Sequence, residues 1–145
     1  MTDTIGPFTT PQLKALAQFL PVFASPDFSP GAMTDMVQNA NGSFSFPYAV
    51  MSEPVMAFLE AAYDNGWVVG HFDWTIWADT NEARRLISDE ADLAEATSDQ
   101  LARLLTVLIR QDRFADGSLL AAFNSGLILR ILRRIDVLLQ TVRAA

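Results

Sequence analysis

The C-terminal segment from Leu101 to Val142 constrains the fold most, because it holds the longest series of apolar residues at helical spacing. At about 100° of rotation per residue, the apolar side chains between positions 127 and 142 fall within one sector of roughly 140°. They are Leu127, Ile128, Ile131, Leu132, Ile135, Leu138, Leu139 and Val142. Such a wide stripe is typical of a helix that packs against several neighbours, so we expect this helix to lie at the centre of the fold.

A second strong helix is expected earlier in the same segment. Thr97 and Gln100 have the spacing of a capping box, in which two side chains satisfy amide groups at a helix start. Leucine and isoleucine then recur every three or four residues over 101–109. Gly117 can adopt a left-handed backbone, and Ser118 is the expected cap of a further short helix. These consecutive helices are predicted to form the hub of the domain.

The first fifty residues carry shorter helix signals. A threonine followed by Pro11 predicts a helix start, and Pro21 should end or kink that helix. Apolar residues at helical spacing predict a second helix over 29–40, which an Asn-Gly pair would stop. Residues 1–50 are therefore expected to form a helical extension packed on the rest.

The middle of the chain mixes extended and helical patterns. Residues 44–50 alternate in polarity with a period of two, which predicts an extended segment that could form a minor two-stranded ribbon with 67–69. Capping side chains predict one helix over 52–66 and another over 73–87. Residues 88–97 are acidic and are expected to be a surface link.

Composition indicates a packed globule, and the helix signals above give its fold class. A chain of 145 residues that is 50% hydrophobic and 19% charged is expected to bury a sizeable core. We predict a single all-α domain over residues 1–145, a compact bundle of five to seven helices. No apolar run approaches the roughly 18 residues of a membrane span, and no secretory pattern opens the chain, so a cytoplasmic protein without membrane association is expected. The chain has no cysteine, which excludes disulfides and thiolate metal ligands.

The net charge of −7 argues against a general affinity for nucleic acid. Residues 1–96 hold three basic and thirteen acidic residues, giving −10, whereas residues 97–145 hold seven basic and four acidic residues, giving +3. The simplest explanation of this uneven charge is that the acidic and basic parts attract each other within one fold. The alternative is that the basic part forms a face for an anionic ligand. Arg130, Arg133 and Arg134 share the polar side of the terminal helix, which makes them the candidate surface for a protein partner.

The best candidate ligand site is the turn at 110–118. If the chain folds back there, the arginines would lie near the amide-rich start of a helix, where a phosphate-like anion could bind. The residues concerned are Arg110, Arg113, Gly117 and Ser118. The favoured alternative is structural: Arg113 pairs with a carboxylate such as Asp73, and Phe114 enters the core.

His71 and Asp73 form the other candidate pair. They would share a face if the segment were extended, and a histidine–carboxylate pair can act as a base or bind metal. His71 is, however, the only histidine, and no further ligand stands at metal-binding spacing. A capping aspartate beside a surface histidine is favoured, so no catalytic set, metal or cofactor is expected.

Four short blocks carry a resemblance. They are Phe72-Asp73-Trp74-x-x-Trp77, Arg110-x-Asp112-Arg113-Phe114-x-x-Gly117-Ser118, Phe123-x-Ser125-Gly126 and Ile131-Leu132-x-Arg134. Together they resemble the signature of a bacterial family of small proteins of unknown function. The resemblance covers about 55–136 and leaves the first fifty residues outside. It implies a shared fold and no particular chemistry.

The sequence therefore favours a non-catalytic interaction module over an enzyme. Its binding surface would be an apolar or arginine-rich face, and its partner another protein or a second copy of itself. The alternative is a small enzyme or sensor that binds a phosphate-like anion near the turn at 110–118.

Overall fold

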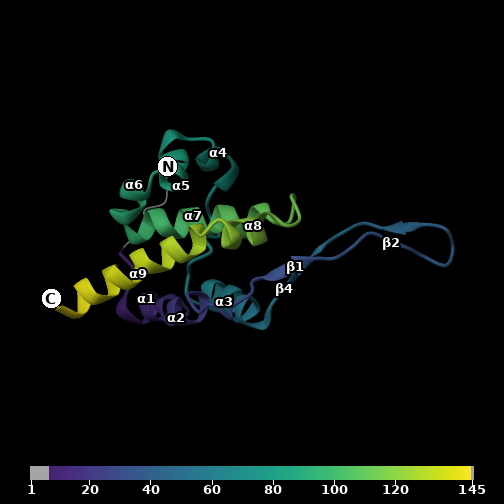
Figure 1. The fold of residues 1–145 in the computed structure, drawn as a ribbon. Helices are drawn as coiled ribbons and strands as arrows, with labels where there is room; N and C mark the ends of the chain where they lie inside the picture. The colour runs from purple at the N-terminus through teal and green to yellow at the C-terminus, as the bar shows by residue number, and fades with distance from the viewer. Residues whose placement is uncertain (1–6, 145) are drawn as a thin grey trace.

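A computed structural model describes residues 7–144, which form a mainly α-helical body and a projecting β-hairpin (Figure 1). The helices are α1 (Thr10–Ala17), α2 (Leu20–Phe23), α3 (Glu53–Asp64), α4 (Trp74–Ala78), α5 (Asn81–Ser88), α6 (Glu90–Ala94), α7 (Ser98–Gln111), α8 (Ser118–Asn124) and α9 (Leu127–Ala144). The strands are β1 (Gly31–Met33), β2 (Val37–Gln38), β3 (Phe44–Ser45) and β4 (Ala49–Met51). The predicted mainly α-helical fold class is confirmed.

Helix α9 is the centre of the helical body. It runs between α1 and α2 on one side and α6, α7 and α8 on the other (Figure 1). Its buried residues are Leu127, Ile128, Ile131, Leu132, Ile135 and Leu139. The predicted stripe is thus confirmed over most of its length, while Val142 lies exposed near the end of the helix.

Helix α7 is the second buried element, and it begins with the predicted capping box of Thr97 and Gln100. Its one fully buried polar residue, Thr106, donates its hydroxyl to the carbonyl of Ala102 at 2.7 Å. The same hydroxyl accepts the N–H of Val69 at 2.9 Å. This contact holds the segment 67–69 against α7, so the predicted pairing of that segment with 44–50 is wrong.

An aromatic cluster joins the N-terminal half to the C-terminal hub. The Phe23 ring lies 5.4 Å from that of Phe58 and 5.2 Å from that of Phe123, between centroids. These residues belong to α2, α3 and α8. Such edge-to-face contacts add to the burial of large apolar rings, so α2 is held to the body although it is a single helical turn.

The prediction of a helix over 29–40 is wrong, because this segment is one half of a β-hairpin. β1 pairs with β4 and β2 with β3, both antiparallel, with Ala32 opposite Val50 and Gln38 opposite Phe44. Gly31 has φ +129°, and a Cβ there would collide with the carbonyl oxygen of Val50. The extended pattern over 44–50 is confirmed, but only part of the expected N-terminal extension is helical.

Residues 7–144 contain more helices than the five to seven expected, in part because one predicted helix is divided and a predicted link contains a helix. The helix predicted over 73–87 breaks at Thr80, whose hydroxyl donates to the carbonyl three residues earlier and accepts the N–H three residues later. The acidic stretch 88–97 contains α6, which the carboxylate of Asp89 caps. Leu93 of α6 is buried, so this stretch is part of the packed body.

Candidate functional site

The most conspicuous surface feature is the hairpin of residues 31–51, which we call the β-arm. It extends away from the helical body, with β2 near its far end (Figure 1). Large apolar side chains along it are 42–79% exposed. They are Met33, Met36, Val37, Phe44, Phe46, Tyr48 and Val50. Its single charged residue is Asp35. An isolated two-stranded ribbon is marginally stable in water, so the β-arm is an element that gains from being covered.

The loop between α7 and α8 anchors the base of the β-arm. The carboxylate of Asp116 accepts the N–H of Ala49, with each oxygen 3.3 Å from the nitrogen. Gly117 lies so close to Met33 that a Cβ on the glycine would be 3.0 Å from the methionine sulfur. The sequence block around 110–118 is therefore a joint between the helical body and the β-arm.

The start of α8 differs from the prediction. The N-cap residue is Gly117, with φ +95°, rather than Ser118. Asp112 supplies the missing acceptor, since its Oδ1 accepts the N–H groups of Gly117 at 3.2 Å and Leu119 at 3.1 Å. The Ser118 hydroxyl is buried and has no hydrogen-bond partner among residues 7–144. Because a carboxylate of the chain itself already occupies these amides, the geometry adds no support for an anion there, and that site stays a prediction.

Arg110 and Arg113 flank the same loop, the first half-buried and the second exposed. In the part of the chain that the structure describes, neither forms a hydrogen bond or an ion pair with another side chain. The expected pairing of Arg113 with Asp73 is wrong. Phe114 does not enter the core: it is 81% exposed and stacks on Trp74, with ring centroids 6.1 Å apart.

Asp73 has the predicted capping role. Its Oδ1 accepts the Thr75 hydroxyl at 2.8 Å and the N–H of Ile76 at 3.3 Å, at the start of α4. The Thr75 hydroxyl, followed by the Ile76 amide, lowers the pKa of Asp73 below its ordinary value, because both donors favour the ionised carboxylate. His71 is exposed nearby. Over residues 7–144, no group of three or more histidine or acidic side chains is arranged to hold a metal ion.

The arginines of α9 line a cleft of about 250 Å³ between α6 and α9, which we call the arginine cleft. Arg130 lies 4.0 Å from the carboxylate of Glu90, and Arg134 donates its Nε to the carbonyl of Ala96 at 2.8 Å. Arg133 is exposed. The sequence identified these three residues as one surface, but the apolar wall that α6 contributes was missed because α6 was predicted to be a link.

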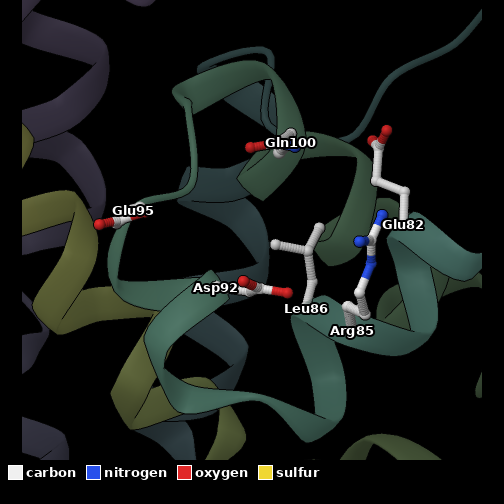
Figure 2. A pocket seen from close by; sticks show the side chains of 6 residues that line it. All are labelled: Glu82, Arg85, Leu86, Asp92, Glu95 and Gln100. Carbon is white, nitrogen blue, oxygen red and sulfur yellow. The ribbon is translucent and has the colours of Figure 1, made fainter.

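A second cleft, of about 260 Å³, lies beside α5 and α6 (Figure 2). Its lining residues are Glu82, Arg85, Leu86, Asp92, Glu95 and Gln100. In Figure 2, Asp92 and Arg85 approach it from opposite sides with Leu86 between them. Glu82 accepts the indole N–H of Trp77 at 3.1 Å, and Gln100 belongs to the capping box of α7. Two of its polar side chains thus already have structural roles, and it is a weaker candidate than the arginine cleft.

These features define a small protein with a mainly α-helical fold, an apolar β-arm and the arginine cleft. The chain belongs to the family described as "Family of unknown function (DUF6508)", whose sequence model matches residues 8–141. The expected membership of a family of unknown function is confirmed, while the expectation that the first fifty residues lie outside it is wrong.

No curated protein and no solved structure matches the chain. Within residues 7–144, no helix combines the length and the apolar character needed to cross a membrane.

Proposed function

We propose that this chain is a non-catalytic interaction module whose binding element is the β-arm, and that the arm binds a second copy of the chain. The observation that carries the proposal is the row of exposed Phe, Tyr, Met and Val side chains on an element that projects from the body. Soluble monomers rarely expose contiguous apolar patches larger than a few hundred Å², and such patches mark interaction sites.

The exposed area supports a dimer of this kind. A buried Phe or Tyr removes about 150–250 Å² from water, and the β-arm presents Phe44, Phe46 and Tyr48 at 56–79% exposure. With its methionines and valines, the arm offers apolar surface on the order of 700 Å². A stable interface needs about 800 Å² from each partner. Two arms that cover each other on both faces would therefore bury close to a standard interface.

Charge favours the β-arm as the meeting point of two copies. Each chain carries −7, so two copies repel each other over most of their surface. The arm holds only Asp35, which leaves this contact nearly free of like-charge repulsion. The hairpin also has open strand edges, to which another strand can add. The same apolar element on both copies makes a self-complementary, twofold contact.

Sedimentation equilibrium tests the proposal. We expect the full chain to have twice the 16.0 kDa mass of one copy. The triple substitution Phe44→Ser, Phe46→Ser, Tyr48→Ser should give a folded monomer, because these side chains lie outside the helical core. Val142→Ser is the matched control, since Val142 is an exposed apolar residue near the end of α9, and this helix ends on the side of the body opposite the β-arm (Figure 1). A wild-type chain that stays monomeric at all concentrations, or a dimer that survives the triple substitution, contradicts the proposal.

A further inference from the structure

We propose that the arginine cleft binds a small organic anion, a carboxylate that carries a short apolar chain. The cleft lies between α6 and α9, away from the β-arm, which projects from the other end of the body (Figure 1). The proposal is independent of the proposed dimer, because the two sites share no residue.

The charge of the cleft is the first argument. Arg130, Arg133 and Arg134 follow one another at positions i, i+3 and i+4, so they project from neighbouring positions on α9. Glu90 is the one carboxylate in the lining, and its 4.0 Å distance from Arg130 makes a weak surface pair. Two nearby acids, Asp92 of α6 and Glu95 at its end, line the other cleft instead (Figure 2). The arginine cleft thus keeps an excess of positive charge in an acidic protein.

Arg134 is held in place before any ligand arrives. Its Nε donates to the carbonyl of Ala96 at 2.8 Å, which fixes the half-buried side chain against the connection between α6 and α7. Its two terminal nitrogens have no hydrogen-bond partner among residues 7–144. A planar guanidinium fixed in this way can bind both oxygens of a carboxylate at a smaller entropic cost than a free side chain.

Apolar side chains complete the cleft. From α6, the exposed Ala94 lines the cleft above the buried Leu93, and Val137 adds an apolar side chain from α9 that is 51% exposed. Ligand sites combine a mostly apolar lining with a few placed polar groups. A volume of about 250 Å³ lies below the usual range for drug-sized molecules, so the ligand is small. A charged head beside the arginines and a short tail against Ala94 and Val137 fit this arrangement.

Hexanoate is the probe for this site, with acetate, hexan-1-ol and hexylamine as comparisons. Isothermal titration with the full chain should show saturable binding of hexanoate and no measurable binding of the other three. Acetate lacks the tail, hexan-1-ol lacks the charge, and hexylamine carries the wrong sign. Where a compound lacks a contact that contributes about 1.4 kcal/mol to hexanoate binding, its affinity is tenfold lower.

Substitutions assign the binding to this cleft. Arg133→Gln should weaken hexanoate binding about tenfold or more, because it removes an exposed charge without disturbing the Arg134–Ala96 hydrogen bond. Arg143→Gln removes an exposed arginine of the same helix outside the cleft and should leave binding unchanged. Methyl NMR signals of Ala94 and Val137 should shift on titration. Absence of saturable hexanoate binding, equal binding of hexan-1-ol, or equal affinity in Arg133→Gln overturns the proposal.

Discussion

Hydrogen bonds from single buried side chains hold separate segments of the chain together, and Thr106 is the clearest case. Its hydroxyl is fully buried, donates to Ala102 within α7 and accepts the N–H of Val69 from the loop between α3 and α4. Thr106→Val keeps the shape but leaves that amide without its partner. We expect the free energy of unfolding to fall by about 1–3 kcal/mol in chemical denaturation. Thr141→Val, at an exposed position of α9, should change it by less than about 0.5 kcal/mol.

The pKa of the Asp73 carboxyl should reflect the hydrogen bonds that this group accepts. Because hydrogen bonds from Thr75 and Ile76 favour the charged form, its pKa in the folded chain lies below the ordinary 3.8. A lowered pKa means that the cap stabilises α4 above pH 3.8 and loses this effect as the pH falls through the folded-state pKa. Carboxyl NMR titration should show this pKa, and Thr75→Ala should raise it. An unchanged pKa in that variant would contradict the assigned cause.

The cap of α8 differs from the one that the sequence predicted at Ser118. The sequence predicted a cap at the right turn, because glycine followed by serine is a common helix start. It did not predict that Asp112, six positions earlier, folds back to bind the Gly117 and Leu119 amides. Nothing in the spacing separates a capping aspartate from a surface one when the turn itself is unknown.

At the scale of elements, the long helices with a buried apolar face were predicted correctly, and the hairpin of the exposed β-arm was not. Helices α7 and α9 are amphipathic and buried, so their periodicity follows from the packing that stabilises them. The β-arm is exposed on both faces, and its apolar residues fit a helical spacing over 32–40 as well as an extended one. Propensity alone could not choose, because the pairing of that segment with residues 44–51 is a contact between distant positions.

Gly31 is predicted to control the base of the β-arm. Gly31→Ala places a Cβ against the carbonyl of Val50 at a backbone angle that favours glycine, so the β1–β4 pairing should open. Amide hydrogen exchange should accelerate in the arm, while the free energy of unfolding of the helical body changes by less than about 0.5 kcal/mol. Gly70→Ala is the control, since a Cβ at Gly70 would have no neighbouring atom within 4 Å and the φ of this glycine is not left-handed. Loss of helical stability in Gly31→Ala would show that the arm is part of the core.

At the scale of the whole molecule, the division of charge separates two ways in which copies could meet. The acidic first two-thirds and the basic last third could bind across two copies, through surfaces such as the arginine cleft. Salt would screen that attraction and weaken such an assembly. The proposed contact between β-arms is apolar and opposed only by the repulsion of two chains of charge −7, so salt should strengthen it.

Sedimentation equilibrium over a salt series therefore distinguishes these assemblies. The dissociation constant of the dimer is expected to fall as sodium chloride is raised, because screening removes the repulsion and leaves apolar burial unchanged. Arg133→Gln should shift the whole series slightly to weaker association by making each chain more negative, with the same sign of salt dependence. A dissociation constant that rises with salt would assign the contact to opposite charges and exclude the β-arm as its main component.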